Sequence, residues 1–289
     1  SDGNVSYVVY GYMNRGSHEG EMGVSVCSYN AEKNLVEEIL YIPRNEIYDV
    51  IKKDVEVLTY LNDEGRFFMY NGIISGNNGG VKNPGMFFMY GGTITSNTAN
   101  NGGGVDNAGT FTMDGGTITS NTANNGGGVY NDNAGRFIMY GGTITGNKAK
   151  EYGGGVFINT GTFTMSGGEI TSNSSESYGG GVCYSSSQLF KMSGTVNITE
   201  NKVGTTPNNL YLWNGQQVSA SGLTSGAEIG VTTQIVPIND SSVPITSDSV
   251  SVNCFSSDKS DYETAIDENS KVVLKKKTAV EAPSITKQP

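Results

Sequence analysis

The residues of this chain that could carry out chemistry are few, and their spacing does not gather them into one site. Enzymes that cleave polysaccharides need clustered carboxylates, or a carboxylate beside a lysine or arginine. Asp106 and Asp114 fall on different predicted strands, and Glu169 stands where neighbouring repeats carry a threonine. No two carboxylates share an equivalent position in adjacent repeats, and Arg136 and Lys191 are isolated. These residues fit solvated surface charge, so the sequence predicts no catalytic residue.

The remaining reactive side chains indicate no metal or cofactor site either. His18, the only histidine, has the setting of an ordinary loop residue, and Cys27, Cys183 and Cys254 are too widely separated to indicate a disulfide framework. The glycine triplets are followed by neither a lysine nor a helix, which argues against a phosphate-binding loop. The segment Asn101–Asp106 resembles a calcium-binding nonapeptide, but the aspartate is replaced in the next repeats. We therefore expect no metal ion and no cofactor.

An internal repeat organises most of the chain. The phrase GGTITSN or a close variant alternates with the phrase GGGV, and a strand of the form aromatic-x-Met lies between them. The first phrase starts at Gly91, Gly115, Gly141 and Gly167, and the second at Gly102, Gly126, Gly153 and Gly179. Successive copies are 24 to 27 residues apart, a period typical of stacked units that are each too small to bury a core alone.

The repeats predict a parallel β-helix. Each copy contains three short strand patterns, and alternation directs Phe111, Met113 and Ile118 inward and Thr110 and Thr112 outward. We therefore predict an all-β fold, a right-handed three-sided parallel β-helix of the pectin-lyase-like solenoid type, with a small N-terminal α+β cap. Equal spacing also predicts interior columns of phenylalanines and methionines: Phe111, Phe137, Phe163 and Phe190, and Met113, Met139, Met165 and Met192.

The pattern divides the chain into four parts. Residues 1–60 read as a capping module of three strands and an amphipathic helix near Asn45–Tyr60, placed to cover the first coil. Residues 61–205 hold the β-helix repeats, and residues 206–277 continue or cap them with weaker strand patterns. Residues 278–289 have the composition of a linker, so we expect further domains of the same polypeptide. The helix face expected to meet the first coil consists of Ile47, Ile51, Val55 and Leu58.

The repeats resemble those of known bacterial surface proteins. The pairing of GGGV with a later Ile-x-x-Asn is similar to the GGA-aliphatic and Phe-x-x-Asn phrases of chlamydial polymorphic outer-membrane proteins. It is still more similar to the Gly/Asn-rich β-helix segments in large surface proteins of gut-type Firmicutes, whose coils often end in phrases like Asn209–Leu212. The resemblance covers about residues 65–275 and implies a fold and an adhesin-like setting rather than an activity. The same solenoid also carries pectin and polysaccharide lyases.

Asparagines recur at one equivalent position of the repeats. Stacked coils would place their amides one above another, so that they hydrogen-bond along the axis at a buried corner. We therefore predict a structural ladder, rather than a ligand site, formed by Asn77, Asn97, Asn121, Asn147, Asn173 and Asn201.

Two outward-facing columns are the candidate binding surfaces. Tyr70, Tyr90 and Tyr140 follow the methionines of their strands, and their rings would form a discontinuous strip on which sugar rings can stack. The alternative is that these tyrosines reflect only β-propensity and stacking between coils. A second column, the Thr-x-Thr phrase seen at Thr117–Thr119, has the character of an ice-binding face, although Glu169 interrupts it. The strand propensity of threonine explains this column more simply.

Composition narrows the expected function. The net charge of −10 repels nucleic acid and anionic lipid, and no apolar run is long enough to cross a membrane. We expect a non-catalytic stalk or adhesin-like display module on the bacterial cell surface, outside the cell, with glycans or surface proteins as partners. A polysaccharide lyase or glycoside hydrolase of the same architecture is the alternative function, and an ice-binding protein is a second alternative.

Overall fold

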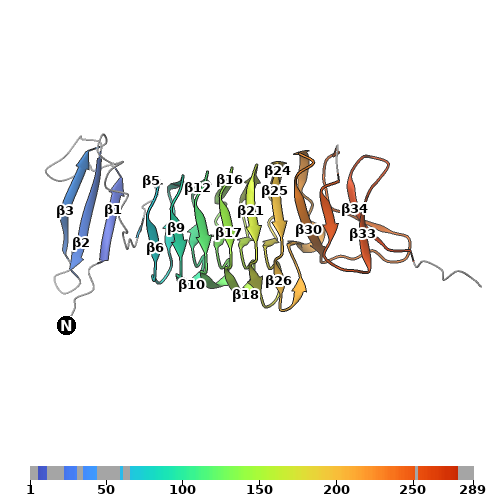
Figure 1. Ribbon diagram of the computed structural model, residues 1–289, viewed down its shortest axis with the longest axis horizontal. Coiled ribbons are helices and arrows are strands. Elements are labelled where there is room, and N and C mark those ends of the chain that lie inside the picture. The colour runs from blue at the N-terminus through green and yellow to red at the C-terminus, as the bar shows by residue number, and fades with distance from the viewer. Residues whose placement is uncertain are drawn as a thin grey trace, which may run out of the picture.

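The computed structural model describes residues 66–250 and 253–278 in full. It also describes the backbone of four earlier strands: β1 (Ser6–Gly11), β2 (Gly23–Asn30), β3 (Leu35–Pro43) and β4 (Thr59–Tyr60). Short strands follow one another along the long axis of the molecule (Figure 1). Among the described residues the only helical turn is the 3-10 turn η1 (Trp213–Gly215). The chain is therefore an all-β protein built around a parallel β-solenoid.

Two of the strand stacks that run along the solenoid carry the aromatic-x-Met and Thr-Ile-Thr phrases. The Met stack comprises β5 (Arg66–Met69), β8 (Met86–Met89), β12 (Thr110–Met113), β16 (Arg136–Met139), β20 (Thr162–Met165), β24 (Phe190–Gly194) and β29 (Ser219–Leu223). The Thr stack comprises β6 (Ile73–Ser75), β9 (Thr93–Thr95), β13 (Thr117–Thr119), β17 (Thr143–Thr145), β21 (Gly168–Thr171) and β25 (Val196–Thr199). Within both stacks all neighbouring strands are parallel.

Two further stacks lie on either side of the glycine triplets. The corner stack comprises β10 (Thr98–Asn101), β14 (Thr122–Asn125), β18 (Lys148–Tyr152), β22 (Ser174–Ser175) and β26 (Lys202–Val203), with β27 (Thr206–Pro207) antiparallel at its end. The Val stack begins at β4 and continues with β7 (Val81–Asn83), β11 (Val105–Asn107), β15 (Val129–Asn131), β19 (Val156–Ile158), β23 (Val182–Tyr184) and β28 (Leu210–Leu212). A complete coil thus contributes one strand to each of four stacks.

The corner stack corrects the expectation of three strands in each coil. Its strands are mostly polar and short, as in β14 with the sequence TANN, so they lack the hydrophobic alternation by which the other strands were predicted. A residue in the left-handed conformation precedes each ladder asparagine and bends the chain there, as at Ser120 (φ 55°) and Gly146 (φ 64°). The bend is followed by the extended corner strand, which pairs with the equivalent strand of the next coil.

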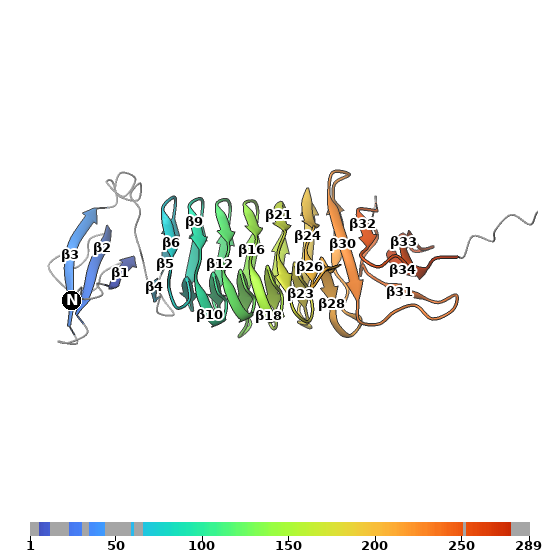
Figure 2. The same ribbon diagram turned by 60° about the horizontal axis from the view of Figure 1, so that its bottom comes forward.

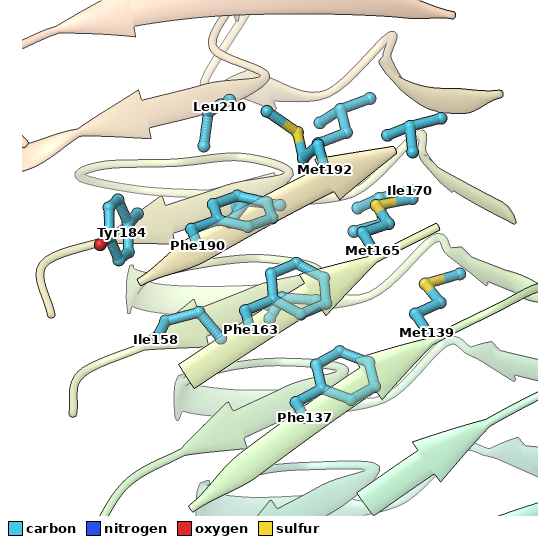
Figure 3. Packing of buried hydrophobic residues seen from close by; sticks show 14 of the residues in the cluster. Phe137, Met139, Ile158, Phe163, Met165, Ile170, Tyr184, Phe190, Met192 and Leu210 are labelled. Carbon is cyan, nitrogen blue, oxygen red and sulfur yellow. The ribbon is translucent and has the colours of Figure 1, made fainter. Parts of the chain in front are cut away.

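The interior is filled by columns of identical side chains, as predicted. Phe111 lies opposite Phe137 in the register of the Met stack, and their rings stack with centroids 4.8 Å apart and planes 2° apart. Figure 3 shows this column beside the column of methionines. All four predicted phenylalanines and all four predicted methionines are buried, which confirms the inward register. The phenylalanine column also extends toward the first coil through Phe87 and Phe67.

The glycine triplets form the tight corner between the corner stack and the Val stack. Their backbone groups bond from coil to coil, for example from the N–H of Gly103 to the carbonyl of Gly126 at 3.1 Å. A Cβ on the middle glycine of a triplet, such as Gly127, would clash with backbone carbonyl oxygens of the adjacent coil. Close approach of two backbones is therefore why glycine is required there.

The C-terminal strands close the far end of the solenoid. The strand β30 (Glu228–Thr233) pairs with β25 through its first residues and with β28 through its last ones, so it joins the Thr and Val stacks into one sheet of 15 strands. The strand β32 (Phe255–Ser257) pairs with β30. An antiparallel sheet follows, with the order β31-β34-β33. Its strands are β31 (Ser242–Pro244), β33 (Tyr262–Ile266) and β34 (Val272–Lys276).

The three predicted N-terminal strands are present. They form an antiparallel sheet in the order β1-β2-β3 at one end of the molecule (Figure 1). Most of the helix predicted near Asn45–Tyr60, with its apolar face, lies outside the described residues. Its last two residues are strand β4, and Thr59 pairs with Val81 of the Val stack, so the helix prediction is wrong at that end. Thr and Tyr favour strands, and here they gain a parallel partner.

Two glycine substitutions should distinguish the cost of a steric clash between neighbouring coils from the cost of an unfavourable backbone conformation. Gly127→Ala should lower the free energy of unfolding by about 3 kcal/mol or more, because its Cβ meets carbonyl oxygens that neighbouring coils hold in place. Gly146→Ala should cost only about 1 kcal/mol. Its φ of 64° is unfavourable for alanine, but the added Cβ would lie 3.5 Å from Oγ1 of Thr119, which is an ordinary contact. Urea denaturation of both variants measures this. Equal costs would contradict the packing role given to the triplets.

Candidate functional site

The predicted asparagine ladder is present at a buried corner of the solenoid. The Oδ1 atom of Asn121 accepts hydrogen bonds from both the backbone N–H and the Nδ2 of Asn97, each at 3.0 Å. The Nδ2 of Asn121 in turn donates to Oδ1 of Asn147 at 3.0 Å and to the carbonyl of Ile94 at 2.9 Å. The same pattern links the neighbouring coils from Asn77 onward. The amides satisfy one another, which is the arrangement that the predicted structural ladder requires.

The C-terminal end of the ladder was not apparent from the repeats. Asn201 donates from its backbone N–H and from Nδ2 to Oδ1 of Asn209, and Asn209 donates in the same way to the two carboxylate oxygens of Asp258. The hydroxyl of Thr232 also donates to Asp258, at 2.9 Å. Burial raises the pKa of Asp258, and these hydrogen bonds oppose that rise. A carboxylate thus accepts the last donors of a row of aligned amides.

A second, shorter ladder was missed by the sequence analysis. In the Val stack the Nδ2 of Asn83 donates to Oδ1 of Asn107 at 2.7 Å, and Asn107 donates to Asn131 at 2.6 Å. The next coil replaces asparagine with Ile158, and the Nδ2 of Asn131 donates instead to the carbonyl of Gly135. The signal was present in the sequence, because each of these asparagines stands two residues after the valine of its strand.

The predicted tyrosine strip is only partly continuous. Tyr70 and Tyr90 stack with ring centroids 5.0 Å apart and planes 9° apart, and Phe68 and Phe88 stack beside them in the same two coils. Tyr140 is separated from this group by one coil that carries a carboxylate instead of a ring. All three tyrosines are exposed, with 37%, 42% and 54% of the surface of Tyr70, Tyr90 and Tyr140 accessible. The strip offers two adjacent rings and one isolated ring.

The structure concentrates aromatic side chains at another place, on the Val stack and the adjoining end of the corner stack. Figure 2 shows strands of both stacks, among them β18, β23 and β28. We call this group the outer aromatic cluster, and it consists of Tyr130, Tyr152, Phe157, Tyr178, Tyr211 and Trp213. Sequence reasoning missed it, although three of its members and Cys183 occupy one column of the register. It joins side chains of several coils into a second apolar cluster outside the solenoid core.

The cluster has a buried floor and an accessible rim. Phe157 and Tyr211 are almost fully buried. Tyr152 and Tyr178 form the rim as a parallel pair, with centroids 6.0 Å apart and planes 10° apart. The ring of Trp213 stands nearly perpendicular to both, with centroids 5.8 Å from Tyr152 and 5.1 Å from Tyr178. Edge-to-face contacts of this kind are favourable between aromatic rings and hold the rim in a fixed arrangement.

A polar network adjoins the cluster at Tyr130. The Tyr130 hydroxyl donates to Oδ2 of Asp132 at 2.8 Å and accepts from Nδ2 of Asn159 at 3.2 Å. Oδ1 of Asp132 accepts from Thr160 at 2.7 Å and from Asn159 at 3.2 Å. Both oxygens of this carboxylate therefore have donors, which fixes its orientation at the edge of the aromatic rings.

The local environments move the pKa values of two neighbouring carboxylates in opposite directions. Burial raises the pKa of Asp106 and outweighs the lowering effect of Lys82, while the charge of Asp132 raises it further. Burial alone would also raise the pKa of Asp132. Hydrogen bonds from the side chains of Thr160, Tyr130 and Asn159 and from the backbone of Asn133 lower this pKa instead. Burial and the hydrogen bond to Asp132 raise the pKa of Tyr130 to about 12, so its hydroxyl keeps its proton at neutral pH.

The acidic residues that the sequence analysis considered lie apart from one another. Asp106 is on the Val stack beside Tyr130, Glu169 is exposed on the Thr stack between Thr143 and Asn197, and Asp114 follows β12. Asp132, which the sequence did not single out, is the carboxylate that interacts with Asp106. It went unnoticed because it lies in a turn of one coil only and has no equivalent in the neighbouring repeats.

Within the described residues there is no group of three or more His, Cys, Asp or Glu side chains that could hold a metal ion. The same residues include no helix that is both long and apolar enough to cross a membrane. Cys183 and Cys254 are free thiols, and burial raises the pKa of each. A thiol with a raised pKa is a poor nucleophile at neutral pH.

No family model, curated protein or solved structure matches the chain. The class of protein is therefore defined by the fold itself, an all-β protein whose coils stack into a parallel β-solenoid. The resemblance of its repeats to those of bacterial surface proteins stays a prediction from sequence.

The ladder leads to a direct stability test. Asn121→Ala should lower the free energy of unfolding by about 3 kcal/mol, because it leaves buried donors of Asn97 and the carbonyl of Ile94 without partners. The matched control is Thr119→Ala on the outer face of the same coil, which should change stability by about 0.5 kcal/mol or less. Chemical denaturation of both variants compares them. A cost for Asn121→Ala as small as that of the control would show that the ladder does not stabilise the fold.

Proposed function

We propose that this chain is a non-catalytic display module of a bacterial surface protein, acting outside the cell as a stiff spacer that contacts glycans. The spacer part of the proposal is supported by the constant register of the coils and by the ladder that runs through them. Each coil contacts the next through backbone hydrogen bonds and buried side chains, so bending would break both together.

The observation that carries the glycan contact is the outer aromatic cluster. Its rim is held by edge-to-face contacts and its floor, Phe157 and Tyr211, is buried, so the rings are presented in a fixed arrangement. Aromatic faces bury the apolar faces of sugar rings, and the hydrogen-bonded network of Tyr130, Asp132 and Asn159 places fixed polar groups beside them. A rigid site of this kind loses little conformational entropy on binding.

One observation favours a second candidate function, a glycoside hydrolase of the same architecture. Asp106 and Asp132 interact, and the pKa of the first is raised while that of the second is lowered, as an acid and its partner carboxylate require. The ice-binding alternative has weaker support. The threonine columns align in register over three coils, but Ile73 and Glu169 occupy the equivalent place on either side.

One experiment distinguishes the glycan-binding display module from the glycoside hydrolase. The full chain is applied to a glycan array and incubated with plant, bacterial and host polysaccharides, and released reducing ends or unsaturated products are measured. We expect binding without turnover, and we expect Tyr178→Ala to weaken binding because it removes an accessible rim ring. Tyr140→Ala, in the tyrosine strip, serves as the matched control.

Release of new reducing ends that is lost in both Asp106→Asn and Asp132→Asn would overturn the non-catalytic proposal in favour of the hydrolase. Absence of binding to every glycan on the array would overturn the glycan contact and leave the spacer role alone.

A further inference from the structure

We infer that the outer aromatic cluster and the carboxylates of Asp106 and Asp132 form one site for a glycan that carries free ammonium groups. The site would disfavour polymers of uronic acids. This inference deepens the proposed glycan contact and rests on it. It differs from the tyrosine strip predicted from the sequence, which lies on the Met stack.

The first step is that the aromatic and acidic groups form one continuous strip. Asp106 and Tyr130 are opposite each other in the register of β11 and β15, and Tyr130 and Phe157 are opposite each other in β15 and β19. The Tyr130 and Phe157 rings are 5.6 Å apart. Because adjacent parallel strands are about 4.8 Å apart, a chain of sugars lying along the solenoid can reach the carboxylates and the rim rings together.

The second step concerns which oxygen atoms are open to a ligand. Both carboxylate oxygens of Asp132 already accept hydrogen bonds from Tyr130, Asn159 and Thr160. The carboxylate of Asp106 is half-buried and accepts no hydrogen bond from any residue that the structure describes. Lys82 attracts it through charge alone, without a hydrogen bond. Asp106 is therefore the acceptor with free capacity, and an ammonium group offers three donors to it.

The third step is the sign of the charge around the rim. The segments that build the site contribute four carboxylates and three ammonium groups: Asp106, Asp132, Glu151 and Glu176 against Lys82, Lys148 and Lys150. Four negative groups and three positive groups leave an excess of one negative charge at the site, on a chain whose net charge is −10. An anionic polymer is repelled by such a surface, whereas a cationic one is attracted.

The aromatic rim also favours a positively charged ligand. Accessible faces of Tyr and Trp attract cations that approach within about 6 Å of the ring centre. The perpendicular arrangement of Trp213 against Tyr152 and Tyr178 presents rings in two orientations at one place. A sugar with a protonated amine can therefore place its apolar face on one ring and its ammonium group near another or near a carboxylate.

The test uses hexasaccharides that differ mainly in charge. Calorimetric titration of the full chain compares β-1,4-linked glucosamine with free amines, β-1,4-linked glucose and β-1,4-linked mannuronic acid, in a mildly acidic buffer of fixed ionic strength. We expect the glucosamine hexamer to bind most tightly and the mannuronic acid hexamer most weakly. Because one exposed ion pair contributes up to about 1 kcal/mol, Asp106→Asn should weaken glucosamine binding roughly 2- to 5-fold and leave glucose binding unchanged.

Variants separate the site from the rest of the surface. Tyr178→Ala should weaken binding of the glucosamine and glucose hexamers roughly 5- to 10-fold, since it removes one accessible ring. Asp114→Asn and Tyr140→Ala, which change a carboxylate and a ring elsewhere, should change neither affinity. Thermal unfolding of each variant checks that the fold is intact. We expect Tyr178→Ala to fold normally because the side chain of Tyr178 is exposed.

Binding of the three hexamers with equal affinity, or tightest binding of mannuronic acid, would overturn the inference while leaving the glycan contact standing. The inference is also overturned if Tyr140→Ala removes binding and Tyr178→Ala does not. If none of the three hexamers binds while other glycans on the array do, this ligand class is wrong. If no glycan binds at all, the proposed glycan contact fails together with the inference.

Discussion

Each coil of this solenoid brings an asparagine amide to a buried corner, where its polar atoms have no access to water. The amide of Asn121 can be satisfied there only by Asn97 on one side and by Asn147 and Ile94 on the other, because those are the polar groups within reach. Coils therefore stack in one register, and a shift by one residue would leave buried donors unpaired. The same register brings phenylalanine onto phenylalanine in the interior and glycine onto glycine at the tight corner.

A fixed register also determines what the outside of the molecule can do. Each outward position becomes a column whose members are one strand spacing apart, so a change in one coil alters the surface at a defined place. On the Val stack such changes replace Lys82 and Asp106 with Tyr130 and Phe157 in the next two coils. The scaffold supplies rigidity, and the variation between coils supplies the charged and aromatic groups that we propose contact a glycan. The proposed function therefore resides in the departures from the repeat.

This division explains what the sequence could and could not predict. The columns of Phe137 and Met139 and the main ladder repeat with the coil, so spacing alone places them. Asp258 as the end of the ladder, Asp132 and Trp213 occur once, and only three-dimensional packing brings them to their partners. The corner strands were missed because they are polar and lack alternation. The outer aromatic cluster could have been found by reading the central residues of the Val strands as one column.

Native-state hydrogen exchange of the full chain tests most directly whether the stacking of the coils depends on the asparagine ladder. The backbone N–H groups of Asn97, Asn121 and Asn147 donate to side chains of the next coil rather than to a backbone carbonyl, so they report on the ladder itself. The account predicts that they exchange among the slowest in the chain, because their exposure requires separation of coils. Exchange of these groups as fast as the exposed N–H of Ala134 would contradict it.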